Sequence, residues 1–192
     1  MEGSDAAVVA LARTGDGEAF RVLVERYSRS VFRLAFRMTA NEHDAEEVVQ
    51  ETFLRAYRSM DRFESRSGFG TWLYRIAANC SLDLIRMRQR HNEHRTQPAG
   101  PEDESDLARS VAASDPTPDR LLLSAEVQQK VAFAMGRMTP MERAAFTLRH
   151  YEGLSIDEIG RTLGLRNSAT KNNIFRAVRK LRQALEPLMS SR

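Results

Sequence analysis

Residues 153–181, "GLSIDEIGRTLGLRNSATKNNIFRAVRKL", decide the fold of the C-terminal part of the chain. Ser155, followed three residues later by Glu158, gives the S-x-x-E capping box that satisfies free N–H groups at a helix start. Gly164 suits the left-handed conformation in which many helices end, and Gly160 permits close approach of a second helix. With apolar residues at helical spacing on both sides, the stretch predicts a helix-turn-helix.

The second helix of this motif has two different faces. Its apolar stripe lies within a narrow arc of a helical wheel and consists of Ile174, Val178, Leu181 and Leu185. The opposite side carries Ser168, Ala169, Asn172, Arg176 and Arg179, with Asn173 and Lys180 on its flank. No acidic residue occurs from position 160 to 184. Because Arg and Asn can form paired hydrogen bonds with base edges, the pattern favours a DNA recognition helix over an ordinary amphipathic one.

The charge of the chain is unevenly distributed, although the net charge is only +3. Residues 1–95 carry 15 basic and 14 acidic side chains, residues 96–120 carry 2 and 6, and residues 121–192 carry 12 and 6. A basic C-terminal part suggests a polyanionic partner. The single cysteine excludes an intrachain disulfide. With no signal peptide and no apolar run of ~18 residues, the sequence predicts a cytoplasmic protein without a membrane span.

The N-terminal part shows helical periodicity and almost no alternating strand pattern. One buried stripe begins at Phe20 and ends at Met38, with Asp16 placed to cap the helix. A second helix is expected to bury Ala45, Val49, Phe53, Ala56 and Met60, and a third begins near Phe69. His91 and His94 are spaced like metal ligands, but neither a Cys nor a carboxylate cluster accompanies them, so no metal or other cofactor is predicted.

Between the two helical parts, "TQPAGPEDESDLARSVAASDPTPD" (residues 96–119) contains four prolines and little apolar content. Such composition is typical of a flexible linker. The predicted fold class is therefore all-α, with two small helical domains at residues 1–95 and 121–192. A flexible acidic linker at residues 96–120 joins them, and rapid hydrogen exchange is expected across it.

Nearly the whole chain resembles the extracytoplasmic-function (ECF) class of bacterial sigma factors. "GDGEAFRVLVERY", "DAEEVVQETFLRAY" and "FGTWLYRIAANCSLDLIRMRQR" resemble their region 2, and "MTPMERAAFTLRHYEGLSIDEIGRTLGL" with the following helix resembles region 4. The resemblance implies a subunit that binds core RNA polymerase, recognises −35 and −10 promoter elements and assists promoter melting. An enzyme is not expected, because no Walker loop, HExxH, nucleophile elbow or CxxC is present.

The resemblance also implies a polymerase-binding face on the second helix. Asp44, Glu47 and Glu51 are spaced i, i+3 and i+7, hence on one face, and Gln50 joins them as a matching residue. An acidic face that also carries an amide suits a basic partner. The alternative for these residues is a solvated acidic face.

For the −10 element, Asn79 matches the family residue that receives an extruded base. We expect Asn79 to end a helix before an Arg-rich segment, and a plain helix-ending role is the alternative to base binding. Phe63 is a candidate for stacking on an unpaired base, with core packing as the alternative. The proposed phosphate contacts are Arg75, Arg86, Arg88 and Arg90.

For the −35 element, the matching residues are Arg149, Lys171, Asn172, Phe175 and Arg176. Two departures from the family pattern stand out: Asn172 and Asn173 occupy positions where Ser and Arg are common, and Arg166 stands where a capping Ser is frequent. Promoter DNA and core RNA polymerase are the implied partners, and a cognate anti-sigma factor is a further candidate. The competing hypothesis is a stand-alone helix-turn-helix regulator, which would bind promoters tightly without polymerase.

Overall fold

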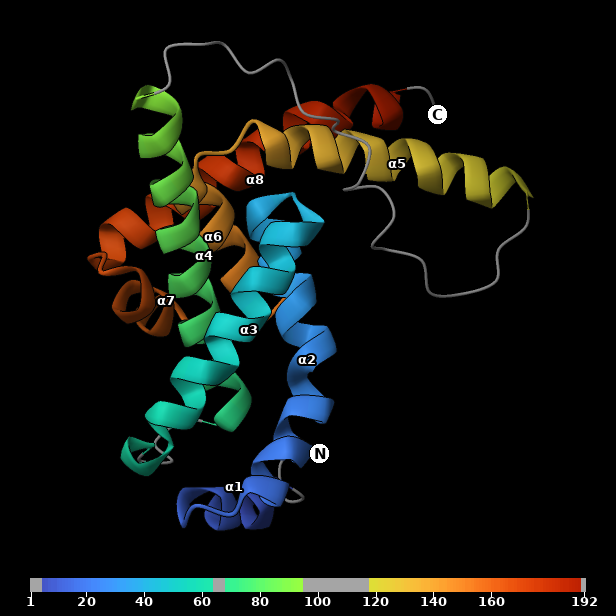
Figure 1. Ribbon diagram of the computed structural model, residues 1–192. Coiled ribbons are helices and arrows are strands. Elements are labelled where there is room, and N and C mark those ends of the chain that lie inside the picture. The colour runs from blue at the N-terminus through green and yellow to red at the C-terminus, as the bar shows by residue number, and fades with distance from the viewer. Residues whose placement is uncertain (1–4, 64–67, 95–117, 191–192) are drawn as a thin grey trace.

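The computed structural model describes residues 5–63, 68–94 and 118–190, and these residues form helices and turns with no strand among them (Figure 1). The predicted all-α class is confirmed. Most of the predicted linker, residues 96–117, lies outside the described residues. The helices are α1 (Asp5–Arg13), α2 (Gly17–Thr39), α3 (Glu42–Arg58), the short 3-10 helix η2 (Met60–Arg62), α4 (Phe69–His94), α5 (Pro118–Gly136), α6 (Pro140–His150), α7 (Ile156–Leu163) and α8 (Asn167–Ser190).

Helices α2, α3 and α4 pack side by side into an N-terminal bundle, and α1 crosses the start of α2 (Figure 1). The expected cap of α2 is present, because the Asp16 carboxylate accepts hydrogen bonds from the backbone N–H groups of Glu18 and Ala19 at 2.9 and 3.0 Å. The predicted stripe of α2 is buried, with Leu23 and Leu34 fully inaccessible. Helix α1 was not predicted.

Helix α4 is one continuous helix of 26 residues, which corrects the expectation that Asn79 ends a helix. Asn79 lies near the middle of α4 and is exposed. The helix continues through this polar stretch because Ala77 and Ala78 are fully buried. The Ser81 hydroxyl also donates to the Ala77 carbonyl at 2.8 Å, which satisfies the buried hydroxyl within the helix.

In the C-terminal part, α5 lies along α8, and α6 packs against α8 (Figure 1). Thr139 and Glu142 form a second capping box at the start of α6, where Pro140 follows the cap. Proline is favoured there because its missing N–H is not needed in the first helical turn. Helix α5 begins at Pro118, inside the stretch expected to be linker.

The N-terminal and C-terminal parts also pack against each other. Helices α6 and α7 contact α4, and α6 contacts α2. As a result, Met38 and Leu73 of the N-terminal part belong to the same buried cluster as Ala145, Leu148 and Ile159 of the C-terminal part. The sequence did not predict this shared core, because periodicity identifies the buried face of a helix but not its distant partner.

Candidate nucleic-acid interface

The turn between α7 and α8 fixes how α8 is held. Both halves of the predicted capping box are present: Ser155 N donates to Glu158 Oε2 at 3.0 Å, and Glu158 N donates to Ser155 Oγ at 3.2 Å. Helix α7 ends at Gly164, whose φ of 66° is left-handed as predicted. A Cβ on Gly160 would lie 2.8 Å from the Leu165 carbonyl oxygen, so the expected close approach at Gly160 is confirmed.

The outer face of α8 is presented to solvent. Its exposed residues include four of the residues predicted to read the −35 element: Lys171, Asn172, Phe175 and Arg176. Phe175 is 66% exposed, so its ring does not pack into the core. The buried side of α8 is centred on Thr170 and Ala177, which lie among the half-buried residues of the predicted apolar stripe.

The sequence predicts Asn173 and Lys180 on the flank of this face. Both side chains instead form hydrogen bonds within the C-terminal part. Asn173 donates to the Ala169 carbonyl at 2.9 Å, which is a bond within α8. Lys180 donates to Glu142 Oε2 at 2.6 Å and to the Arg137 carbonyl at 2.9 Å. Burial raises the pKa of Glu142, but the bonds from Lys180 and Thr139 outweigh it and leave that pKa below its ordinary value.

Arg149 is exposed at the end of α6, beside the segment that leads into α7. Its Nη1 donates to the Leu154 carbonyl at 2.9 Å. This bond supports the loop before the helix-turn-helix and leaves other guanidinium N–H groups for a further acceptor.

The arginines of α4 are held differently from the cations of α8, because acidic side chains pair with most of them. Arg75 contacts Glu158 of α7 at 3.2 Å, and Arg86 lies 3.7 Å from Asp83 of its own helix. Arg88 pairs with Asp44 of α3. Arg90 donates to the Arg86 carbonyl at 3.4 Å.

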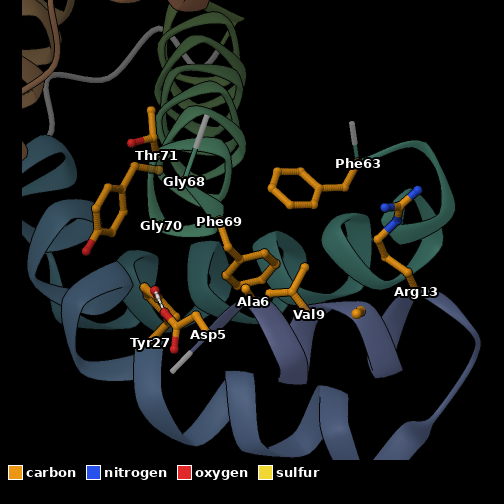
Figure 2. Close-up of a pocket in the computed structure, with 12 residues that line it drawn as sticks. Asp5, Ala6, Val9, Arg13, Tyr27, Phe63, Gly68, Phe69, Gly70 and Thr71 are labelled. Carbon is orange, nitrogen blue, oxygen red and sulfur yellow. Dashed lines mark hydrogen bonds between the residues drawn. The ribbon is translucent and has the colours of Figure 1, made fainter. Parts of the chain in front are cut away.

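Phe63 is only 4% exposed and packs against Phe69 and Trp72, with ring centroids 5.8 and 5.0 Å away. The structure therefore favours its packing alternative over stacking on a base. Phe63 also lines a pocket of about 520 Å³ between α1, α2 and the start of α4 (Figure 2). At the opposite side of this pocket, the Tyr27 hydroxyl donates to Asp5.

A groove of about 490 Å³ between α3 and α4 collects three of the four residues predicted to bind polymerase: Glu47, Gln50 and Glu51. Leu54 and Met87, which are 44% and 52% exposed, add apolar surface to it. Cys80 also lines the groove, and burial raises the pKa of its thiol.

Asp44 does not share this groove. Its carboxylate is buried, with the residue only 3% exposed, and faces Arg88. The i, i+3, i+7 spacing correctly places Asp44 on the same side of α3 as Glu47 and Glu51, but α4 covers the first turn of that side. In this structure, Asp44 is therefore not presented to a partner as Glu47 and Gln50 are.

Comparison with known families places both halves of the chain. Residues 23–91 match the model of sigma-70 region 2, and residues 128–181 match the model of sigma-70 region 4. An ECF RNA polymerase sigma-E factor from Haemophilus influenzae is 33% identical over 186 residues, which cover 97% of each chain. The chain belongs to the ECF family of sigma factors. It therefore acts with RNA polymerase in promoter-specific transcription initiation.

Two further relatives of this sigma factor extend the comparison. The ECF sigma factor SigE of Mycolicibacterium smegmatis is 37% identical over 175 residues, which are 90% of this chain but only 65% of that relative. Among solved structures, CnrH in complex with the cytosolic domain of CnrY is 26% identical with a TM-score of 0.61. That match covers 95% of this chain and 97% of CnrH, so it includes both helical parts.

Within residues 5–63, 68–94 and 118–190 of this sigma factor, no helix is long and apolar enough to cross a membrane. In the same residues, no three His, Cys, Asp or Glu side chains gather where they would hold a metal ion.

Sequence reasoning missed the acidic partners of the α4 arginines. Glu158 was recognised as a capping residue, but its second contact, to Arg75, joins residues 83 positions apart. No local pattern signals such a pairing. For Asp44 a signal existed, because an acidic residue in the first turn of a helix often serves its own fold.

Proposed function

We propose that the outer face of α8 reads the −35 element of the promoter. The observation that carries this proposal is the joint exposure of Lys171, Asn172 and Arg176 on a helix whose other side is docked by Thr170 and Ala177. Within the part of the chain that the structure describes, no ion pair involves Lys171 or Arg176. Asn172 and Arg176 are assigned to base edges, and Lys171 and Arg149 to phosphates or guanine edges.

Of the two asparagines that depart from the family pattern, only Asn172 is proposed to affect promoter choice. The side-chain N–H of Asn173 donates to the Ala169 carbonyl, whereas the side chain of Asn172 is exposed. An amide at position 172 can accept and donate at once, which suits an adenine edge. Phe175, exposed beside it, offers an apolar contact for a thymine methyl group.

We assign the −10 element to the exposed side of α4. Asn79 is proposed to bind one extruded base and so to assist melting, since its amide can pair with a base edge. Arg75, Arg86, Arg88 and Arg90 are proposed to contact phosphates, although each is held by another group in this structure. The buried ring of Phe63 is left a packing role.

The groove between α3 and α4 is proposed as the docking site for core RNA polymerase. Glu47 and Gln50 are exposed beside Leu54 and Met87, so the groove joins acidic, amide and apolar surface. A mixed surface of this kind can dock a basic helical partner, with charge complementarity steering the encounter. Asp44 contributes indirectly, by holding α4 against α3 through Arg88.

The remaining assignments concern partners and location. We propose cytoplasmic action, a non-catalytic role and regulation by a cognate anti-sigma protein. The solved relative CnrH is in complex with the cytosolic domain of CnrY, which supports the binding of a further protein to this chain. The domain bounds 1–95 and 121–192 also remain proposals, and the family matches at residues 23–91 and 128–181 fit within them.

Transcription from a promoter library tests these assignments. Core RNA polymerase is assayed with and without this chain, and the 5′ ends of the transcripts are sequenced. We expect chain-dependent start sites that share one −35 and one −10 sequence. The stand-alone regulator hypothesis would regain support if the isolated chain gave tight, sequence-specific gel shifts while no chain-dependent start sites arose.

A further inference from the structure

The residue that precedes α8 cannot cap this helix through its side chain. The Arg166 carbonyl accepts from the Thr170 backbone N–H at 2.9 Å, so Arg166 occupies the position just before the first helical turn. A side chain there ordinarily accepts a bond from a free backbone N–H group, but a guanidinium carries donors only. The start of α8 therefore depends on contacts with other parts of its domain.

One such contact is a hydrogen bond between the first residue of α8 and the first turn of α7. The Asn167 side chain donates through Nδ2 to the Asp157 carboxylate. Both residues line the same hollow beside the turn that joins the two helices. Each helix thus contributes a side chain from its own beginning to one bond that spans the helix-turn-helix.

Gly160 makes room for this bond. It follows Asp157 by three residues and therefore lies on the same side of α7. A Cβ on Gly160 would lie 3.3 Å from both Asn167 Oδ1 and Thr170 Oγ1, so the first turn of α8 rests directly on the backbone of α7. The Asn167 amide has its oxygen over Gly160 and its nitrogen at Asp157, which fixes the side chain in one orientation.

We propose that Asp157 and Asn167 form a clamp that positions α8 for reading the −35 element, in place of an N-terminal cap. The clamp rests on the proposed reading of that element by α8. Lys171 lies one turn beyond Asn167, and Asn172 follows it, so a shift at the start of α8 moves both relative to the DNA. Paired hydrogen bonds to a base edge tolerate little displacement, because hydrogen bonds weaken steeply with poor angles. Asp157 is a positioning residue, since it acts on the bases only through Asn167 and the helix.

The clamp is tested in the holoenzyme, with the strongest promoter recovered from the library and with the same promoter carrying a scrambled −35 element. The ratio of the two transcript levels measures dependence on the −35 element. For Asn167→Ala and for Asp157→Ala, we expect this ratio to fall about threefold to tenfold, the factor for loss of one exposed hydrogen bond. Transcription from the scrambled promoter should stay within about twofold, whereas a general loss of folded protein would lower both levels together.

A double variant distinguishes the clamp from a direct contact of Asn167 with DNA. If both side chains act through one bond, Asp157→Ala combined with Asn167→Ala should lower the ratio no further than either single change. Gln183→Ala, which removes an exposed amide farther along α8, is the matched control and should leave the ratio unchanged. An unchanged ratio in either single variant, or additive losses in the double variant, would overturn the clamp.

A second arm follows the clamp in the free full-length chain, without DNA. Hydrogen exchange is measured at the Thr170 backbone N–H, whose bond to the Arg166 carbonyl closes the first turn of α8. Exchange should be about threefold to tenfold faster in Asn167→Ala, because the turn opens more often. Asp157→Asn combined with Asn167→Asp should restore the wild-type rate, since the amide at position 157 then donates to the carboxylate at position 167.

The two arms separate failure of the clamp from failure of the proposed function. Unchanged exchange in Asn167→Ala, or no recovery when the two side chains are exchanged, would overturn the clamp. If scrambling the −35 element had no effect on transcription by the wild type, the proposed reading of that element by α8 would fail instead, whatever the exchange rates.

Discussion

Helices α4 and α8 both carry cationic faces proposed to contact promoter DNA, yet they present these faces in different states. On α8, Lys171 and Arg176 lie on the exposed side of the helix, and its opposite side packs against the rest of the domain. On α4, Arg75, Arg86 and Arg88 are each paired with a carboxylate, and two of those carboxylates come from other helices. The face proposed to read the −35 element is already exposed, whereas the arginines proposed to contact the −10 element would have to exchange their carboxylate partners for phosphates.

This difference follows from where each helix lies. Helix α8 is at the edge of its domain and packs on α5, α6 and α7 with one side only. Helix α4 lies between the other N-terminal helices and the C-terminal part, so its arginines meet acidic groups from both directions. Under the proposed assignments, binding at the −10 element would be coupled to the contacts between the N-terminal and C-terminal parts, and binding at the −35 element would depend mainly on the docking angle of α8.

The largest effect is expected from Arg176→Ala. Loss of a bidentate contact to a base edge should remove ~1–3 kcal/mol of discrimination at one −35 position. The −10 preference should be unchanged, because Arg176 belongs to the exposed face alone. Promoter-library transcription measures both preferences at once.

Arg182→Ala, which removes the same charge from another exposed part of α8, is the control and should leave both preferences intact. An altered −10 preference in Arg176→Ala would contradict the division between the helices.

Gly160→Ala tests whether the docking angle of α8 sets −35 recognition. The new methyl group would lie 2.8 Å from the backbone oxygen of Leu165, which cannot move away without shifting the turn. We expect the free energy of unfolding to fall by about 1–2 kcal/mol, since overpacking outweighs the helix propensity gained from alanine. Activity should fall most on promoters that depend on a strong −35 element.

Gly17→Ala is the control, because a Cβ at that position has nothing within 4 Å. Urea unfolding and transcription of both variants give the comparison. Unchanged stability of Gly160→Ala would show that the turn can yield, and the fixed docking angle would have to be abandoned.

Helix caps and turns could be predicted well from the sequence, whereas contacts between residues distant in sequence could not. The caps at Asp16 and Ser155 and the turn at Gly164 depend on neighbouring residues, and all are present. The continuous α4 was missed because Asn79 and Ser81 favour helix ends, and only burial of the flanking alanines overrides that preference.

For the candidate sites, too, features of a single helix could be predicted and pairings between helices could not. Exposure of Asn172 and Arg176 follows from the wheel alone, because a single helix fixes which residues share a side. The pairing of Asp44 with Arg88, or of Arg75 with Glu158, depends on helices distant in sequence. Only the folded chain brings these groups together.

Asn79→Ala should act in the opposite sense from Arg176→Ala. If the Asn79 amide pairs with an extruded base, its loss should cost about 1–2 kcal/mol, the range of one or two hydrogen bonds. Preference at one −10 position should relax, and promoter opening should slow because the extruded base is less well held. Permanganate footprinting of unpaired thymines follows the opening. A variant with altered −35 preference and normal opening would refute the assignment.

Arg88→Ala distinguishes a phosphate contact from a purely structural pair. As a phosphate contact, Arg88 should affect all promoters about equally, and its loss should reduce the slope of log affinity against log salt by about 1. Because Arg88 also faces the buried Asp44, some loss of stability is expected in either case. The deciding quantity is thus the salt slope of holoenzyme binding. If stability fell and the slope did not change, Arg88 would be a structural partner of Asp44 only.

Glu142→Gln is expected to have the smallest effect and to confine it to stability. Lys180 is the α8 cation that turns inward, and its bond to Glu142 helps to keep the pKa of that carboxyl below the ordinary 4.5, against the effect of burial. A lowered folded pKa means that the charged carboxylate stabilises the fold above about pH 4.5, and that this contribution is lost as the pH falls through the folded value.

The Glu142→Gln variant keeps the capping geometry, so the wild type should exceed it in unfolding free energy by about 1 kcal/mol or less near pH 7. The difference should shrink below about pH 4.5, where the wild-type carboxylate takes up a proton. Urea unfolding at a series of pH values measures it, and library transcription should show unchanged −35 preference. A shift in that preference would mean that Lys180 reaches DNA after all, and the contrast between the inward and outward cations of α8 would not hold.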